Sequence, residues 1–228
     1  MKLNKFENKE QMSLAAAAYT SDLIRTNTSK GEVFTIALSG GRSPVRFYEL
    51  MAKEEIDWSM VKIFLVDERK VDADNEYSNY RMIKKALLSK IDIPETNIFS
   101  FKTDINSAVE CSSEYEDRIR KVFGNLYPVF DLIVLGVGPD GHTASLFPGV
   151  DHFIEEDKIF ITTTAPEQFD VPERLTMTLS LINRAKSRIF VISGKGKGNM
   201  VQRVFNEDST IPAGLINTNS TIFFDNLL

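Results

Sequence analysis

The feature that most limits the possible folds is a series of short apolar runs, each of strand length and each followed by polar or glycine-rich residues. The clearest runs span 33–38, 61–66, 132–135 and 189–192, and further candidates span 159–162, 175–179 and 221–224. Several are apolar at every position, which is typical of parallel strands covered on both faces. Between the runs, apolar residues recur at helical spacing, as at Met12, Ala16 and Leu23. Strands that alternate with helices predict an α/β fold with a doubly wound, mostly parallel sheet flanked by helices.

Length and charge indicate an ordinary globular domain. The chain has 228 residues without an internal repeat, low-complexity tract or linker, so we expect one domain spanning residues 1–228. The formal net charge of −5 argues against broad nucleic-acid affinity, which needs a basic surface. The first residues lack the apolar core of a signal peptide, and no apolar run reaches the ~18 residues that span a bilayer. We therefore expect a cytoplasmic protein that binds neither nucleic acid nor membranes, and no protein partner is evident.

The cysteine and histidine content limits metal chemistry. Cys111 is the only cysteine, which excludes an internal disulfide and any site with several cysteine ligands. It lies on the apolar stripe of a predicted helix, so a buried thiol is the favoured interpretation. The two histidines, His142 and His152, do not form an H-E-x-x-H motif. We expect no metal and no cofactor, and we interpret His152 as a structural or surface residue.

The first candidate site is the turn Ser-Gly-Gly-Arg-Ser-Pro after the first apolar run. In open α/β sheets, ligands bind beyond the carboxyl ends of the strands. Gly40 and Gly41 allow backbone N–H groups to converge on an anion near the start of the next helix. Ser43 is a plausible N-cap and Pro44 suits the first helical position. The turn predicts either a phosphate site, to which Arg42 would add a cation, or an ordinary strand-to-helix connection.

The second candidate is the tripeptide Asp67, Glu68 and Arg69, directly after another apolar run. Adjacent side chains at a strand end point in opposite directions, so the two acids are not predicted to face each other. Arg69 could stabilise an anion or pair with a neighbouring acid. A solvated cluster of charges is the alternative interpretation.

The third candidate, residues 136–149, contains a formal match to the dinucleotide fingerprint G-x-G-x-x-G. That fingerprint should open a long helix that leads to a strand ending in an acid. Here Pro148 and Gly149 are expected to stop any helix within a turn or two. We therefore reject a dinucleotide site.

The same segment places His142 beside Asp140 in a turn at a strand's carboxyl end. A histidine has an unperturbed pKa near ~6.5, so a neutral imidazole can take a proton at pH 7. Most lone histidines are structural or lie at the surface. The Gly-Pro-Asp-Gly setting favours a functional role for this one.

The fourth candidate is the turn Ser-Gly-Lys-Gly-Lys-Gly over residues 193–198, which lacks Walker A spacing. Lys197 in this turn could neutralise a phosphate. Upstream, Arg174 in a Pro-Glu-Arg triplet supplies another cation before an apolar run. Both side chains could equally lie on a solvated face.

Taken together, these segments resemble the glucosamine-6-phosphate isomerase/6-phosphogluconolactonase family, and within it the 6-phosphogluconolactonases. The resemblance runs from about residue 34 to residue 205. It rests on residues 37–44, 67–69, 78–80, 136–149, 172–176 and 194–197. The run Gly-Pro-Asp-Gly-His-Thr-Ala-Ser-Leu-Phe-Pro-Gly over 138–149 is the most specific.

The resemblance implies a fold like that of glucosamine-6-phosphate deaminase. It also implies hydrolysis of 6-phospho-D-glucono-1,5-lactone to 6-phospho-D-gluconate, a step of the oxidative pentose phosphate pathway, without a metal. In such a site His142 would draw a proton from the attacking water and Asp140 would orient the imidazole or its loop. Arg69 would stabilise the tetrahedral oxyanion or hold the carboxyl end of the sugar, and the resemblance leaves open which of Arg69 and Arg174 faces which end of the substrate.

The resemblance further implies a set of residues that bind the 6-phosphate of the substrate. They are Gly40, Gly41, Arg42, Ser43, Arg174 and Lys197. Arg42 departs from the family pattern, which often has a small hydroxyl residue there. The side-chain contribution at this position is therefore open, whereas the backbone contribution is not.

Two other functions are possible for such a chain. An amino-sugar-phosphate deaminase or isomerase of the same fold needs an acid placed for C2, and it typically has an Asn-Glu-Pro stretch where this chain has Ser-Leu-Phe-Pro at 145–148. A non-catalytic sugar-phosphate sensor would need an attached partner-binding segment. The ~32 residues before the first run, interpreted mainly as one helix, leave little room for it.

Overall fold

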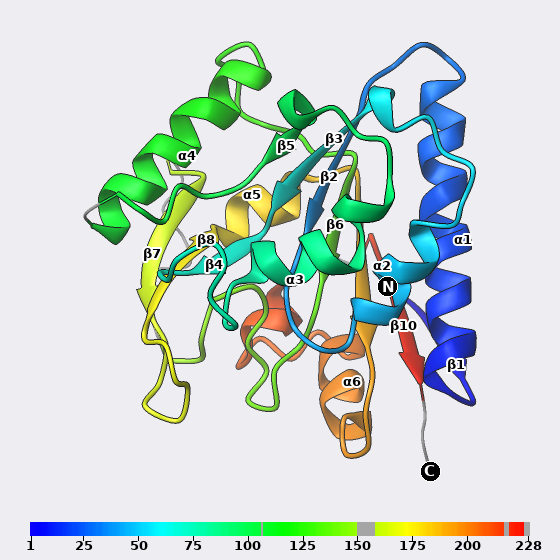
Figure 1. The fold of residues 1–228 in the computed structure, drawn as a ribbon. Helices are drawn as coiled ribbons and strands as arrows, with labels where there is room; N and C mark the ends of the chain where they lie inside the picture. Colours follow the sequence, from blue (N-terminus) through cyan, green and yellow to red (C-terminus); the bar gives the residue numbers. More distant parts are fainter. Residues whose placement is uncertain (106, 150–157, 217–218, 226–228) are drawn as a thin grey trace.

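The central element of the computed structural model is a sheet of seven parallel strands in the order β1-β10-β9-β6-β2-β3-β5 (Figure 1). The structure describes residues 1–105, 107–149, 158–216 and 219–225. The strands of this sheet are β1 (Lys2–Phe6), β2 (Phe34–Leu38), β3 (Val61–Leu65), β5 (Ile98–Phe99), β6 (Leu132–Leu135), β9 (Ser187–Ile192) and β10 (Ser220–Asp225). Every residue of β2 and of β6 is buried, as their non-alternating patterns predict. The predicted α/β fold is confirmed.

Helices flank the sheet. They are α1 (Lys9–Thr28), α2 (Val45–Met51), α3 (Asn79–Ala86), α4 (Ala108–Val122), α5 (Leu179–Arg184) and α6 (Gly198–Phe205), with short 3₁₀ turns at Trp58–Met60, Leu88–Lys90, Glu95–Asn97 and Pro212–Leu215. Helix α1 packs against α2 and β10, and α2 in turn contacts α3. The α1 face buried there includes Ser13, Thr20 and Ser21, whereas the expected Leu23 is only half-buried. Small side chains on this face suit close packing of one helix on another.

A second, smaller sheet accounts for three segments that the sequence pattern could not place. Strands β4 (Asp67–Arg69), β8 (Glu173–Met177) and β7 (Phe160–Thr164) pair antiparallel in that order. Val66 alone separates β3 from β4, so the chain leaves the parallel sheet at its carboxyl end and begins the small sheet there. Helix α4 packs on β7 and β8. The small sheet thus lies beside the strand ends at which ligands bind in this fold class.

Strand β1 is an element that the sequence pattern did not predict. Lys2 and Lys5 are exposed and the other residues of β1 are half-buried, because the strand forms one edge of the sheet. Cys111 is buried on α4, as expected. In the parts of the chain that the structure describes, no helix is both long and apolar enough to cross a membrane.

Candidate functional site

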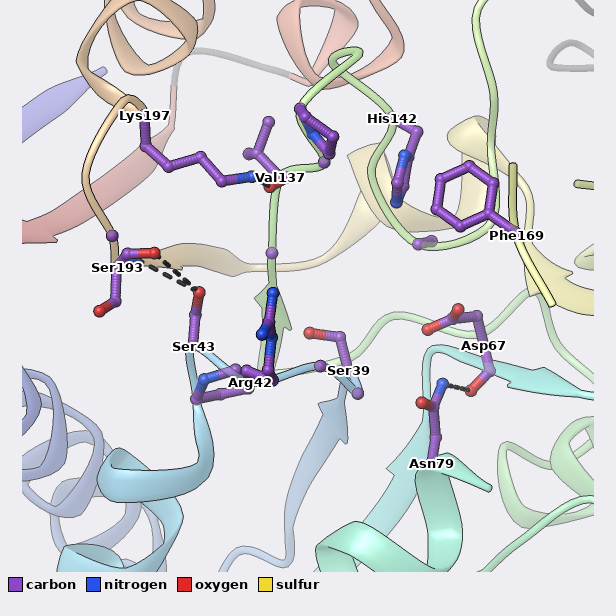
Figure 2. Close-up of a pocket in the computed structure, with 18 of the residues that line it drawn as sticks. Ser39, Arg42, Ser43, Asp67, Asn79, Val137, His142, Phe169, Ser193 and Lys197 are labelled. Atoms are coloured by element: carbon purple, nitrogen blue, oxygen red, sulfur yellow. Dashed lines mark hydrogen bonds between the residues drawn. The ribbon is translucent and has the colours of Figure 1, made fainter. Parts of the chain in front are cut away.

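The carboxyl ends of β2, β6 and β9, together with strand β4, surround a cleft of about 550 Å³. Loops from these strands form its walls, and the side chains approach each other from both sides (Figure 2). All but two of the predicted site residues line it: Gly40, Gly41, Arg42, Ser43, Arg69, His142 and Lys197. The two exceptions, Asp140 and Arg174, lie behind residues that do. His152, interpreted as structural, is outside the residues that the structure describes.

One side of the cleft holds a histidine–aspartate pair. Nδ1 of His142 lies 2.5 Å from Oδ1 of Asp140, and the two side chains are 19% and 26% exposed. Burial opposes ionisation of Asp140, but its hydrogen bonds and charge interaction with His142 prevail and hold the pKa of the carboxyl below its usual value. An ionised Asp140 accepts a hydrogen bond, so Nδ1 carries the proton of the neutral imidazole. Nε2 of His142 is then left as a proton acceptor.

The loop that carries this pair contains no helix, which corrects the expectation of a short helix before Pro148. Its backbone instead folds back on itself: the N–H of Gly138 donates to the carbonyl of His142 at 2.8 Å. Gly141 has a φ of 88°, a conformation that suits glycine. A Cβ there would also lie 2.6 Å from atoms of Ile211. The turn therefore depends on glycine, as its composition indicated.

Two phenylalanines enclose the imidazole. The His142 ring lies 4.9 Å from the ring centre of Phe147 and 5.4 Å from that of Phe169, the latter edge-to-face. Phe169 is half-buried although its neighbours Gln168 and Asp170 are exposed. Its ring also contacts the guanidinium of Arg174, whose Cζ lies 5.9 Å from the ring centre. The two rings limit rotation of the imidazole and exclude water from part of its surface.

The opposite side of the cleft is formed by the glycine turn after β2. Within the described chain, no backbone N–H of residues 40–43 donates a hydrogen bond to another residue. Gly41 adopts a φ of 96°. A Cβ on Gly40 would lie 1.8 Å from Oδ1 of Asn79, so only glycine fits beside that amide. Unpaired N–H groups that line a cleft form an anion-binding concavity.

The predicted N-cap role of Ser43 is wrong. Helix α2 begins at Val45, its N-cap is Pro44, and no side chain caps it. The Ser43 hydroxyl instead accepts from the N–H of Ser193 at 3.3 Å and donates to the carbonyl of Ser193 at 3.4 Å. The Ser43 hydroxyl bonds to the backbone of the turn after β9 instead of capping α2. Ser43 therefore contributes its backbone N–H to the cleft.

Three cations surround the glycine turn. Nζ of Lys197 donates to the carbonyl of Val137 at 2.8 Å, and burial lowers its pKa, with the charge of Arg42 acting in the same direction. Nζ of Lys9, the first residue of α1, donates to the carbonyl of Arg42 at 3.0 Å. Lys197 and Arg42 lie on the side of Ser43 and Ser193, away from His142 (Figure 2). This side of the cleft therefore combines positive charge with unpaired backbone N–H groups.

A third group lies on one face of the small sheet. Arg69 is paired directly opposite Arg174, and Asp67 opposite Thr176. Directly opposed like charges destabilise a sheet. Burial lowers the pKa of Arg174 to about 10, and Arg69 contributes to this, whereas Asp67 and Glu68 oppose it. The buried Nε atoms of both arginines have no hydrogen-bond partner among the described residues.

Asp67 and Glu68 point to opposite sides, as expected. Oδ2 of Asp67 accepts from the Ser145 hydroxyl at 2.7 Å, and its residue lines the cleft. Glu68 is buried and accepts from the N–H groups of Asn79 and Tyr80 at 2.7 and 2.8 Å. Burial raises the pKa of Glu68 in spite of these bonds. Glu68 therefore anchors the start of α3, whereas Asp67 lines the cleft.

Several residues of the cleft were not predicted as site residues. They include Lys9, Ser39, Asp67, Asn79, Phe169 and Ser193. Asp67 and Asn79 lie in motifs that were noted, but Lys9 and Phe169 carry no local signal. Among the described residues, no three His, Cys, Asp or Glu side chains cluster closely enough to hold a metal ion.

A family model described as glucosamine-6-phosphate isomerases/6-phosphogluconolactonase matches residues 7–224. The chain belongs to this family. It is 36% identical over 194 residues to a 6-phosphogluconolactonase of Synechocystis sp., covering 84% of this chain and 79% of the relative. It is 35% identical over 224 residues to a probable 6-phosphogluconolactonase 4 of Arabidopsis thaliana, covering 91% and 85%. The solved 6-phosphogluconolactonase of Thermotoga maritima has a TM-score of 0.81 and 28% identity, with 98% of both chains covered.

Membership of the glucosamine-6-phosphate isomerase/6-phosphogluconolactonase family confirms the resemblance stated from the sequence. The fold of its solved member is also that of this chain. The family description joins two reactions on sugar phosphates. Residues from both sides of the cleft, His142 on one and the glycine turn on the other, line the same space in this chain.

Proposed function

We propose that this protein hydrolyses 6-phospho-D-glucono-1,5-lactone to 6-phospho-D-gluconate. This is the reaction after which its relatives, the 6-phosphogluconolactonases, are named. One observation carries the proposal. A single cleft combines the His142–Asp140 pair on one side with the unpaired backbone N–H groups of residues 40–43 on the other. A phosphorylated lactone offers a matching pair of groups, an anion at one end and an electrophilic carbonyl at the other.

In this mechanism Nε2 of His142 takes a proton from a water molecule as its oxygen attacks the lactone carbonyl carbon. The carbonyl π electrons move to oxygen and give a tetrahedral oxyanion. When the oxyanion re-forms the C=O, the bond to the ring oxygen breaks, and the imidazolium returns the proton to that oxygen. Asp140 stabilises the imidazolium and keeps Nδ1 protonated. The products are a carboxylic acid, which ionises, and a free hydroxyl.

Arg69 and Arg174 form the anion-stabilising pair on the His142 side. Arg69 lines the cleft, and Arg174 contacts the Phe169 ring that packs on His142. We assign Arg69, which lines the cleft, to the developing oxyanion, and Arg174, directly opposite it but behind the cleft wall, adds its positive charge at the same place. Arg174 was expected at the phosphate, but its neighbours in the structure favour this assignment.

The 6-phosphate binds at the glycine turn. Backbone N–H groups of Gly40, Gly41, Arg42 and Ser43 donate to its oxygens, and the side chains of Arg42 and Lys197 supply charge. Half-buried Lys197 is held against the carbonyl of Val137, so its ammonium is already positioned. These contacts exist in the ground state and in the transition state alike, so they act mainly on KM.

The test is hydrolysis of freshly generated 6-phosphogluconolactone, followed by pH-stat or NMR and corrected for spontaneous opening. Unphosphorylated gluconolactone is the matched substrate. We expect catalysis of the first and poor turnover of the second. Equal kcat/KM for both lactones contradicts the phosphate site, and absence of catalysis on either contradicts the function.

The position of Asp67 favours one second candidate. An amino-sugar-phosphate isomerase needs an acid near C2 as well as a histidine, and Asp67 lines the same cleft as His142. Release of ammonia from glucosamine 6-phosphate tests it. We expect none, because the segment after His142 supplies no further acid up to Pro148.

We further propose that the chain forms one domain and works in the cytoplasm. In support, β1 pairs with β10, so the first and last described segments belong to one sheet. The buried free thiol of Cys111 is compatible with a reducing compartment. The ligand is a small sugar-phosphate lactone, and the net charge of −5 gives no reason to expect nucleic acid.

A further inference from the structure

Asp225 is a fully buried carboxylate that the reaction above does not use. It is the last residue of β10 and has no exposed surface. Oδ2 accepts from the hydroxyl of Ser193 at 2.5 Å, and Oδ1 accepts from the N–H of Gly194 at 2.9 Å. Both partners belong to the turn after β9 that leads to Lys197. Burial of a carboxylate is costly unless its hydrogen bonds are well made.

These bonds continue across the sheet. Ser193 also exchanges two hydrogen bonds with the hydroxyl of Ser43, in the glycine turn after β2 (Figure 2). In the sheet, β6 separates β9 from β2. The end of β6 is joined to the same group of loops, because Nζ of Lys197 donates to the carbonyl of Val137. Hydrogen bonds therefore connect the carboxyl ends of four neighbouring strands, β10, β9, β6 and β2.

We propose that Asp225 and Ser193 are positioning residues for phosphate recognition. The hydrogen-bonded chain of Asp225, Ser193 and Ser43, which we call the strand-end belt, holds the glycine turn and the Lys197 turn at a fixed separation. The unpaired N–H groups on one turn and the ammonium on the other then face the same phosphate. This inference rests on the proposed phosphate site and adds what sets its geometry.

The chain offers a control carboxylate at the amino ends of the strands, opposite the carboxyl ends that the belt connects. Asp131 precedes β6 and is also buried, with Oδ2 accepting from the N–H and hydroxyl of Thr35 at 2.8 and 2.7 Å. It lies at the amino end of the strands and does not line the cleft. Asp225→Asn and Asp131→Asn each place an amide where a buried carboxylate accepted hydrogen bonds, and Asp131→Asn also removes the ion pair between Oδ1 of Asp131 and Nζ of Lys186, which are 2.8 Å apart. Only the first change affects the belt.

The experiment measures binding of 6-phosphogluconate and of gluconate by calorimetry, together with KM, kcat and Tm, for wild type and variants. We expect Asp225→Asn to weaken 6-phosphogluconate binding and to raise KM about tenfold, the effect of one charge-assisted hydrogen bond. Gluconate binding and kcat change little. Ser193→Ala behaves in the same way, whereas Ser193→Thr, which keeps the hydroxyl, restores affinity. Asp131→Asn lowers Tm without changing phosphate selectivity.

Each alternative result is informative. Unchanged 6-phosphogluconate affinity in Asp225→Asn and Ser193→Ala overturns the belt, and so does an equal loss for gluconate or a matching loss in Asp131→Asn. If Asp225→Asn does not fold, the comparison of Ser193→Ala with Ser193→Thr tests the belt by itself. If wild type binds 6-phosphogluconate but hydrolyses no lactone, the proposed function fails and the binding data still judge the belt. If wild type shows no preference for the phosphorylated ligand, both fail.

Discussion

Gly138 lies directly against the ring of His142: a Cβ at this position would come within 2.1 Å of the ring atoms Cε1 and Nδ1, and within 2.7 Å of Oδ1 of Asp140. The glycine is therefore required by space and not by its own backbone angle. Its missing side chain is what allows the imidazole and the carboxylate to meet. A substitution at Gly138 therefore tests the histidine–aspartate pair.

We predict that Gly138→Ala lowers kcat by at least about tenfold while KM for the phosphorylated lactone changes little. The added methyl group displaces the imidazole from Asp140, so the base is misplaced, whereas the glycine turn is untouched. Steady-state kinetics check this. Gly136→Ala is the control, because a Cβ there would meet nothing within 4 Å. Equal kcat in the two variants contradicts the assigned geometry.

His142→Asn should lose about 10²–10⁴ in kcat, the usual contribution of a positioned general base. An amide can donate or accept a hydrogen bond, but it cannot take the proton of the attacking water at pH 7. Thermal melting is measured alongside, since the ring packs against Phe147 and Phe169. A folded variant that keeps more than about a third of kcat shows that His142 is not the base.

The fold was largely predictable because its strands are covered on both faces. Burial on both sides makes the sequence apolar at every position, and the run at 132–135 matches β6 at both ends. Strand β1 was not predicted because it lies at an edge of the sheet, where lysines are tolerated and the apolar pattern is weak. Strands β7 and β8 were detected, but nothing local tells which sheet a strand joins.

Site residues were predictable only where the functional groups lie close together in the sequence. His142 and Asp140 are two residues apart, and the glycine turn is contiguous, so both could be found from sequence. Ser43 shows the limit: its local context indicates an N-cap, yet its partner Ser193 lies 150 positions away. Phe169 reaches the imidazole through loop geometry alone. Contacts of this kind depend on the tertiary fold, which a single sequence does not display.

The pH dependence of phosphate binding should report Lys197. Burial lowers its pKa, so the ammonium loses its proton at a lower pH than an ordinary lysine does. The affinity for 6-phosphogluconate should therefore be full on the acid side of that pKa and fall as the pH rises through it. Calorimetry between about pH 7 and 10 measures this fall, with gluconate as the control ligand. Lys197→Arg, which stays charged, should remove it. A fall that persists in the arginine variant assigns it to another group.

Arg69 and Arg174 should act as one unit. We predict that Arg69→Ala and Arg174→Ala each reduce kcat by about 10²–10³, and that the double variant loses less than the product of the two effects. The reason is their direct opposition across β4 and β8. A double-mutant cycle in kcat/KM measures the coupling. If Arg174→Ala instead raises KM for the phosphorylated lactone alone, Arg174 belongs to the phosphate, as first expected from the resemblance.

The last prediction concerns Lys9, a cation of the cleft that lies in none of the sequence motifs. It begins α1, lines the cleft, and donates to the carbonyl of Arg42. We expect Lys9→Met to raise KM for the phosphorylated lactone about twofold to fivefold, the range for one partly solvated ion pair. The kcat should stay the same, since this contact is present before and during the reaction. Unphosphorylated gluconolactone should be turned over as before.

Lys5→Met is the matched control for this variant. It removes the same charge from the neighbouring strand β1, but Lys5 is exposed and does not line the cleft. A general loss of positive potential would affect both variants and would shrink in both as salt is added. A local contact affects only Lys9→Met and survives at higher ionic strength, because the ligand in the cleft is partly shielded from solvent. Equal KM values in the two variants would therefore remove Lys9 from the phosphate site and leave Arg42 and Lys197 as its cations.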